Sequence, residues 1–254
     1  MNKVLKAGII KVNTNHPRYK SLEKTLSLID KYYDKLDLII GPEWSLMNND
    51  YKEGPLNYKE FKKILDYIRN YSKFSNALII PGTAVISTKN KRMYNISPVF
   101  YNGDVIFSTI KRADGGTSFF NINEEYELLD DCFIENSFKW GKLKIGIEIC
   151  ADSGSLFRNG KRDLNLQILL SNGIRDTDIA VKKGGYILCS DGNTRSGIRN
   201  YIIKNNYDKK GIKLNEYIDF FKPLKNQNYI NKYFEFVPIK EQHKNIDIYE
   251  LTLK

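Results

Sequence analysis

Three apolar runs in this chain end at residues with chemically useful side chains, and this pattern constrains the fold most. Residues 36–40 form a short apolar strand that stops at Gly41-Pro42, directly before Glu43. The second strand of a hairpin around Asn102-Gly103 ends at Lys111. Residues 141–152, GKLKIGIEICAD, form a turn and an alternating strand that ends at Cys150. Strand ends are where side chains of layered α/β proteins meet ligands.

Apolar periodicity predicts alternating strands and helices along the whole chain. Residues 21–35 and 58–74 show helical spacing, and shorter helices are predicted at 176–183 and 214–221. The predicted strands span 4–12, 36–40, 77–86, 94–101, 105–110, 132–140, 143–150, 167–170, 186–189, 234–237 and 246–253. The strand at 77–86 is interrupted by Pro81-Gly82. No linker or repeat divides residues 1–254, although the pattern is hardest to interpret from about residue 192 onward. We therefore expect one domain of the layered α/β or α+β class.

Composition excludes several classes of function. The net charge of +10 is spread along the chain, and no basic arm, zinc finger or RNA-binding platform is present, so no nucleic-acid partner is expected. The two histidines and three cysteines form no metal-binding spacing, and no phosphate- or dinucleotide-binding motif occurs. The N-terminus has no apolar run long enough for a signal peptide or membrane span. We expect a cytoplasmic protein with no metal, no cofactor and no membrane partner.

The three strand-end residues have complementary chemistry. A cysteine needs a base, because its free thiol has a pKa near 8.5. With almost no histidine in the chain, the carboxylate of Glu43 is the natural base for Cys150. Lys111 could stabilise negative charge that develops on a carbonyl oxygen, with the backbone N–H of Ala151 as a second donor.

These motifs resemble those of the nitrilase superfamily of carbon–nitrogen hydrolases. LDLIIGPEW resembles the strand that carries the family's general base, here Glu43. YNISPVFYNGDVIFSTIKR resembles the hairpin that carries its lysine, here Lys111, and GKLKIGIEICAD the strand that carries its nucleophile, here Cys150. DIAVKKGGYILCSDG resembles the following helix and strand, with Ser190-Asp191 where an asparagine is common.

The resemblance implies a four-layer αββα sandwich, frequently paired into homodimers, and a second active-site glutamate. Glu124 is the preferred candidate for that glutamate, Glu125 is the alternative, and Glu127 also lies nearby. It also places Ser190 and Asp191 among the substrate-binding residues. From strand alternation we expect Glu148 on the same face as Cys150, either as an ion-pair partner of Lys111 or Lys144 or in contact with substrate.

The combined interpretation is a cysteine-dependent hydrolase of non-peptide carbon–nitrogen bonds that acts through a thioester. A small-molecule amide is favoured over a nitrile as the substrate. Two alternatives stay open at this point. The same Glu-Lys-Cys site could transfer the acyl group to an amine, or the chain could be a catalytically silent relative that binds a partner.

Overall fold

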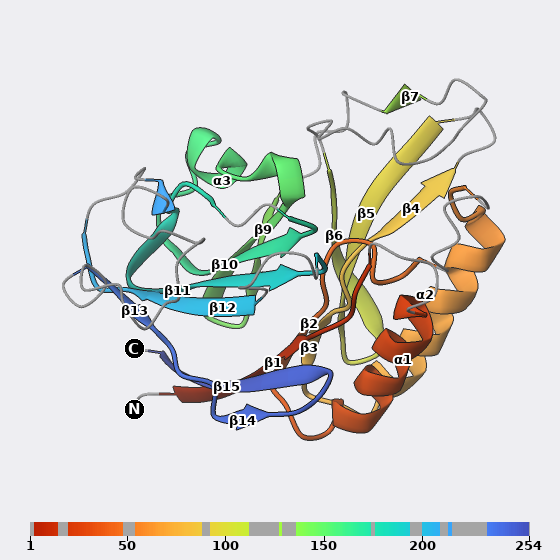
Figure 1. Ribbon diagram of the computed structural model, residues 1–254, viewed down its shortest axis with the longest axis horizontal. Helices are drawn as coiled ribbons and strands as arrows, with labels where there is room; N and C mark the ends of the chain where they lie inside the picture. Colours follow the sequence, from red (N-terminus) through yellow and green to blue (C-terminus); the bar gives the residue numbers. More distant parts are fainter. Residues whose placement is uncertain are drawn as a thin grey trace.

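The computed structural model describes residues 3–14, 20–47, 54–87, 92–111, 127–128, 136–173, 176–193, 200–208, 213–214 and 233–253. Two β-sheets face each other in these residues, and two long helices cover the outside of the first sheet (Figure 1). The two ends of the described chain lie side by side, because the first and last strands pair antiparallel along their whole length.

The first sheet has nine strands, with the order β14-β15-β1-β2-β3-β5-β4 and with β6 and β7 also paired to β5. Strands β1, β2 and β3 are parallel, and β6 runs in the same direction as β3 because β3–β5 and β5–β6 are both antiparallel. The carboxyl ends of β2 and β6 therefore reach the same edge. The strands are β1 (Lys3–Ile10), β2 (Leu38–Ile40), β3 (Leu78–Ile80), β4 (Ala84–Ser87), β5 (Arg92–Tyr101), β6 (Asp104–Ile110), β7 (Glu127–Leu128), β14 (Glu241–Gln242) and β15 (Ile246–Leu253).

The second sheet has six strands in the order β13-β12-β11-β10-β9-β8. Its centre, β9 to β11, is parallel, with an antiparallel pair at each side. A 3-10 turn at Cys150–Asp152 and the one-turn helix α3 (Ser155–Arg158) connect β9 to β10. The strands are β8 (Ser137–Trp140), β9 (Leu143–Ile149), β10 (Leu164–Ser171), β11 (Val181–Asp191), β12 (Asn200–Asn205) and β13 (Phe234–Phe236).

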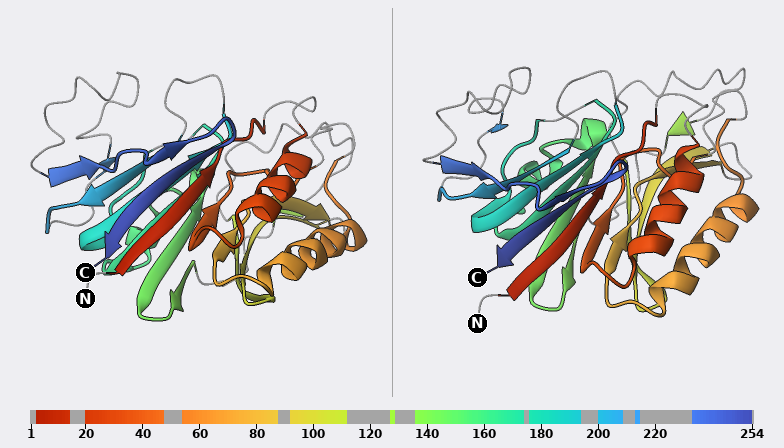
Figure 2. Two further views of the ribbon diagram at one scale, coloured as in Figure 1. Left: turned by 90° about the horizontal axis from the view of Figure 1, so that it is seen from below. Right: turned by 60° about the horizontal axis from the view of Figure 1, so that its bottom comes forward.

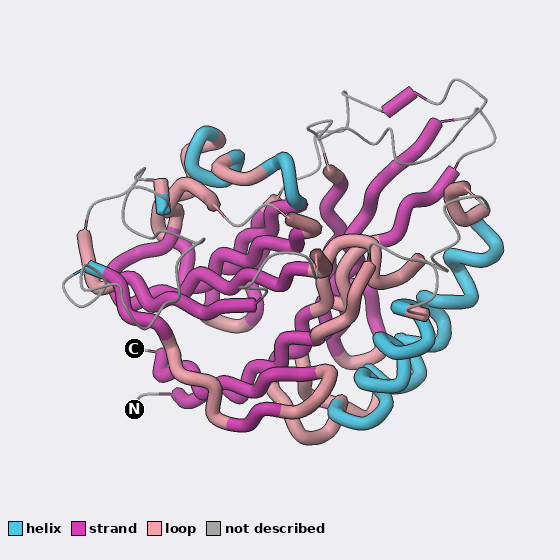
Figure 3. Tube along the Cα trace, in the orientation of Figure 1, coloured by secondary structure: helices cyan, strands magenta, loops and turns pink. Residues whose placement is uncertain are grey.

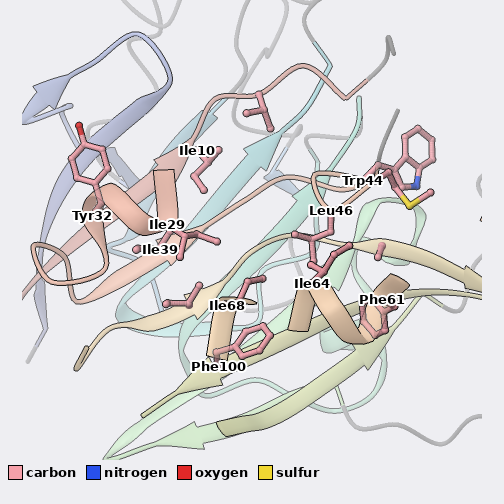
Figure 4. Close-up of a cluster of buried hydrophobic side chains, with 14 of the residues drawn as sticks. Ile10, Ile29, Tyr32, Ile39, Trp44, Leu46, Phe61, Ile64, Ile68 and Phe100 are labelled. Carbon is pink, nitrogen blue, oxygen red and sulfur yellow. The ribbon is translucent and has the colours of Figure 1, made fainter. Parts of the chain in front are cut away.

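The helices of the first sheet are amphipathic, as their spacing predicts. They are α1 (Ser21–Tyr32) and α2 (Tyr58–Ser72), and both lie on one side of the molecule in the views of Figure 2. Asn57 and Glu60 form a capping box that fixes the start of α2, with side-chain to backbone bonds of 3.0 and 2.9 Å. The apolar faces of α1 and α2 pack on β1, β2 and β3 through residues such as Ile29, Ile64 and Ile68 (Figure 4).

Strand alternation divides the apolar side chains between the two faces of each sheet. Between the sheets, Leu5, Ala7 and Ile9 of β1 meet the inner faces of β9, β10 and β11. Among the described residues, the outer face of the second sheet packs against α3 and the connecting segments (Figure 3). The described layers are therefore helix, sheet, sheet and a thin outer cover that contains α3, which confirms the predicted mixed α/β sandwich with two facing sheets.

The helix predicted at 176–183 is wrong. Residues 176–180 are not helical and contain only an isolated bridge from Asp178 to Lys213, and β11 already begins at Val181. Ile179, Ala180 and Val181 are buried in succession, which is incompatible with the single apolar face of a surface helix. The side chain of Gln167 holds this segment by accepting the backbone N–H of Ala180 at 2.9 Å.

The interruption predicted at Pro81-Gly82 within 77–86 is confirmed, because β3 and β4 are separate strands on either side of residues 81–83. One further prediction needs correction. Strand β12 lies in the part of the chain where the sequence pattern gave no strand, and it extends the second sheet. The helix predicted at 214–221 lies almost wholly outside the described residues.

Candidate active site

Glu43 is held rigidly at the end of β2. Gly41 approaches the backbone of Pro81 so closely that a Cβ there would lie 2.3 Å from the Pro81 oxygen, so only glycine fits. The backbone N–H of Trp44 donates to Thr83 Oγ1 at 2.9 Å, and that of Leu46 to the Thr83 carbonyl at 3.1 Å. The turn that carries Glu43 is thus fixed against the β3–β4 connection, and the Glu43 side chain is fully buried.

Lys111 and Asn95 both bind the Glu43 carboxylate. Lys111 Nζ lies 2.9 Å from Glu43 Oε1, and Asn95 Nδ2 donates to the same oxygen at 2.8 Å. The backbone N–H of Lys111 donates to the Asn95 carbonyl at 2.8 Å, so the β5–β6 hairpin sets both side chains. Glu43 Oε2 has no hydrogen-bond partner among the residues that the structure describes. This oxygen is the one left to take up a proton.

Cys150 lies at a sharp turn directly after β9. Its φ of 47° is left-handed, a conformation that residues with a side chain seldom adopt and that costs about 1 kcal/mol or more. The turn breaks strand alternation, so Cys150 packs with the cluster between the sheets, on the same side as Ile147 and Ile149. A strained, over-determined backbone at a nucleophile is a common feature of functional sites.

The charges of the three side chains are coupled. Burial raises the pKa of Glu43, and Lys111, Cys150 and Asn95 only partly offset this. Burial lowers the pKa of Lys111, but the nearby Glu43, Cys150 and Asp152 outweigh it, and the net pKa is raised. Burial and the Glu43 charge raise the pKa of Cys150 to about 12, against the opposing effects of Lys111 and of a hydrogen bond from the Asn172 backbone. The resting cluster is therefore a neutral thiol beside an ion pair.

Ser190 and Asp191, predicted to bind substrate, lie at the end of β11. Ser190 is buried and pairs with Leu170 in the sheet, and its Oγ has no hydrogen-bond partner in the described part of the chain. Leu188 on the same strand packs between the sheets, so Ser190 points the same way. Asp191 instead accepts the backbone N–H groups of Gly173 and Asn193 at 2.8 and 2.9 Å, which fixes the adjoining loops.

The prediction that Glu148 and Cys150 share a face is wrong. The left-handed turn at Cys150 sends the two side chains to opposite faces of the second sheet. Lys111 pairs with Glu43 and Lys144 with Asp163, so neither is the partner expected for Glu148. Glu148 accepts hydrogen bonds from Leu156, Gln167 and Thr177 on the outer face. These contacts favour a supporting role over direct contact with substrate.

Some site residues are undescribed, and two others were missed by sequence reasoning. Glu124 and Glu125 lie outside the described residues, so the second glutamate stays a prediction. Asn95 was missed although an amide in the middle of the buried strand MYNISPVF is a usable signal. Asp152, 7% exposed, was quoted only as part of the Cys-x-Asp motif, yet its charge acts on Lys111.

Ala151 directly follows Cys150 in the 3-10 turn. Within the described ranges, no group of three or more His, Cys, Asp or Glu residues could hold a metal ion. No described helix combines the length and apolarity needed to cross a membrane.

Comparison with known proteins gives a match in structure but not in sequence. No family model matches the chain, and no curated protein matches it. Among solved structures, the nitrilase-superfamily protein Nit3 of Saccharomyces cerevisiae has a TM-score of 0.58 at 13% identity, over 98% of this chain and 90% of Nit3. A carbon–nitrogen hydrolase from Helicobacter pylori has a TM-score of 0.59 at 11% identity, over 97% of this chain and 88% of the hydrolase.

A glutamine-dependent NAD+ synthetase from Acinetobacter baumannii has a TM-score of 0.61 at 14% identity, over 95% of this chain. The chain spans about half of that enzyme, since the match covers 49% of it. All three matches extend over 95–98% of this chain. At 11–14% identity the likeness concerns the fold, and on that ground the chain is a divergent example of the nitrilase-superfamily fold.

Proposed function

We propose that this protein hydrolyses a non-peptide carbon–nitrogen bond, an amide rather than a nitrile, through a thioester on Cys150. The observation that carries the proposal is the buried Glu43–Lys111 ion pair beside a cysteine in a left-handed turn. A fully buried ion pair is expensive to maintain and contributes little net stability. Its position next to a nucleophile supports a catalytic protein over a silent binding protein.

The raised thiol pKa determines how the reaction starts. At pKa about 12, Cys150 holds its proton at neutral pH, so a free thiolate does not accumulate. Glu43 Oε2 takes the proton as Sγ bonds to the carbonyl carbon of the amide, and the carbonyl electron pair moves to oxygen. Lys111 Nζ and the Ala151 backbone N–H hold this oxyanion. Burial raises the pKa of Glu43 as well, which improves its match to the proton it must accept.

The intermediate then collapses and the carbon–nitrogen bond breaks. The amine or ammonia leaves with the proton from Glu43, and a thioester remains on Cys150. Water attacks the thioester, Glu43 accepts a proton from that water, and the proton returns to the departing sulfur. Glu124 would help to orient Lys111 and the substrate, and the Ser190 hydroxyl, buried and without a described partner, would bind a polar group of the substrate.

Trapping the acyl-enzyme tests the proposal. We expect an activated aryl ester, used with the wild-type chain, to add one acyl group to Cys150 with a burst of aryl alcohol, read by intact mass and absorbance. Cys150→Ala should abolish both signals while melting at a temperature near that of the wild type.

Cys150→Ser should also fail, because a carboxylate base ionises a hydroxyl far less readily than a thiol. The matched control is Cys189→Ala, since Cys189 is buried in the outer cluster, away from Glu43. Acylation that persists in Cys150→Ala, or that maps to Cys189, would overturn the assignment of the nucleophile.

A further inference from the structure

Glu148 is a buried acid that the proposed reaction does not use. Its side chain lies on the outer face of β9, and the residue is 1% exposed. The carboxylate accepts the backbone N–H of Leu156 at Oε1 (2.9 Å), and at Oε2 it accepts Gln167 Nε2 (3.1 Å) and the Thr177 hydroxyl (2.5 Å). The backbone N–H of Gly154, which donates to Thr177 Oγ1, also lowers the pKa of Glu148. A buried carboxylate with this many donors is part of a structural hydrogen-bond network rather than a solvated surface charge.

The donors come from the two segments that shape the nucleophile turn. Gly154 and Leu156 belong to the connection that begins at Cys150 and ends in α3. Thr177 belongs to residues 176–180, the crossing segment, which is hydrogen-bonded to this connection, and its Oγ1 also accepts the Gly154 N–H at 3.1 Å. Ser153 Oγ donates to the Asp176 carbonyl, which ties the same two segments a second time.

Gln167 completes the network from β10. Its Nε2 donates to Glu148 and also to the Asp178 carbonyl at 2.9 Å, while its Oε1 accepts the Ala180 N–H. Glu148 thus holds together β9, β10, the nucleophile turn and the crossing segment. The turn that carries Cys150 therefore depends on the carboxylate of Glu148.

We propose that Glu148 is a positioning residue for Cys150. The ionised carboxylate of Glu148 fixes the turn 150–156. Protonation of Glu148 loosens this turn and slows the acylation of Cys150. The inference rests on the proposed nucleophilic role of Cys150. The chemical reason is that an ionised carboxylate only accepts hydrogen bonds, which matches the three donors from Leu156, Gln167 and Thr177. A protonated carboxyl group brings its own O–H among those donors, so at least one of them loses its acceptor.

The surroundings place this change near neutrality. Burial raises the pKa of Glu148 to about 7, against the lowering effect of the bonds from Thr177, Leu156, Gln167 and Gly154. The charged groups on the elements packed against it are Arg158 on α3, Asp152 in the nucleophile turn, and Asp176 and Asp178 in the crossing segment. Arg158 is directed at Asp178 (3.6 Å) and at the Ser153 carbonyl (3.1 Å) rather than at Glu148.

A matched pair of variants at Thr177 tests the inference without touching the reacting groups. The measurement is the rate of Cys150 acylation by the activated aryl ester from pH 5 to 9. For the wild type we expect the rate to fall as the pH drops through about 7. Thr177→Val removes a donor that lowers the Glu148 pKa, so its rate limb should move upward by up to about one pH unit, with a fall of several-fold at pH 7. Thr177→Ser keeps the hydroxyl and should retain the wild-type limb.

Glu148→Gln resembles the protonated form and should give the slow, low-pH rate even above pH 8. Asp163→Asn, which removes an exposed ion pair with Lys144 beside the same strands, should behave as the wild type. If Thr177→Val does not fold, Thr177→Ala removes the same donor with less steric change, and the same shift is expected.

The possible outcomes separate this inference from the proposed function. The acylation rate could fall at the same pH in the wild type, Thr177→Val and Glu148→Gln, with only the melting temperature of the variants lowered. Glu148 would then have a structural role only, and the inference would be overturned. If Cys150 of the wild-type protein is not acylated at any pH, the proposed function is overturned, and this inference is overturned with it.

Discussion

At the scale of single residues, burial controls the chemistry of the cluster. Glu43 is fully buried, so the pKa of its carboxyl is raised even though Lys111 and Asn95 hydrogen-bond to one of its oxygens. Desolvation penalises the charged form, and the ion pair offsets only part of that penalty. The same environment keeps the Cys150 thiol protonated at neutral pH.

Lys111→Met should reduce turnover by about two to three orders of magnitude, because it removes a donor to the oxyanion. It also removes the positive charge that lowers the pKa of Glu43, so that pKa should rise further. In the proposed reaction the ionised carboxylate of Glu43 is the base. The fall in turnover that comes from protonation of Glu43 should therefore move to higher pH. Steady-state turnover against pH checks both effects, and Lys144→Met on β9 is the control, since its exposed pair with Asp163 is far from the chemistry. Unchanged turnover in Lys111→Met would exclude the proposed role.

Glu148 should make the stability of the protein depend on pH. Its folded pKa of about 7 lies above the ordinary value of 4.5, so the folded state binds this proton more tightly than the unfolded state. The contribution to stability is therefore full below about pH 4.5 and is lost as the pH rises through 7. The difference between the two pKa values corresponds to about 3 kcal/mol.

Urea unfolding of the wild type and Glu148→Gln at several pH values measures this contribution. We expect the difference in unfolding free energy between the two proteins to change across that window by a few kcal/mol, with the wild type losing stability relative to the variant at higher pH. Asp163→Asn should follow the wild type. A pH-independent difference would mean that the Glu148 pKa is not raised in the folded protein.

At the scale of elements, the unit formed by β9, the nucleophile turn and α3 is closely packed over one glycine. A Cβ at Gly146 would lie 2.6 Å from Leu164 Cδ1 and 2.7 Å from the two methyl carbons of Leu156. The absence of a side chain at Gly146 lets Leu156 sit on β9, and this brings the Leu156 N–H to Glu148.

Gly146→Ala should destabilise the protein by about 1–3 kcal/mol through overpacking and should slow Cys150 acylation by displacing α3. A double-mutant cycle provides the control. In a Leu156→Ala background two of the three obstructing methyl carbons are gone and only Leu164 Cδ1 remains, so the same Gly146→Ala change should cost less. Urea unfolding and the acylation rate give the two measurements, and an equal cost in both backgrounds would contradict the packing argument.

At the scale of the whole molecule, the two sheets are joined by the apolar layer between them. Ile168 of β10 is fully buried in this layer, together with Leu38 and Ile40 of β2 from the opposite sheet. Phe107 of β6 and Phe138 of β8 stack across the same interface, with ring centroids 4.6 Å apart. Because Glu43 and Lys111 come from one sheet and Cys150 from the other, this layer also sets the geometry of the site.

Ile168→Ala should lower the unfolding free energy by about 2–5 kcal/mol, the usual cost of a large core truncation. Phe74→Ser, at a residue 78% exposed, should change it by less than about 0.5 kcal/mol. Chemical denaturation of both variants tests the contrast. Similar losses in the two proteins would mean that the inter-sheet layer is not the main core.

The amino-acid sequence by itself determined the order of the elements up to β10, the two amphipathic helices and the strand ends that carry Glu43, Lys111 and Cys150. These features follow from local rules, namely apolar periodicity, the Gly41-Pro42 breaker and the Asn102-Gly103 turn. The resemblance of three motifs in the right order then predicted the fold, and the structural relatives confirm it.

Only the tertiary structure decided which side chains meet. The left-handed φ of Cys150 turns it away from Glu148, and no pattern of alternation can predict such a break. The bond from Asn95 to Glu43 joins residues 52 positions apart, and the Gln167 contacts override the local helical signal at 176–183. Each is a long-range hydrogen bond or a strained dihedral, whose energy depends on partners that are distant in the sequence and therefore absent from any local pattern.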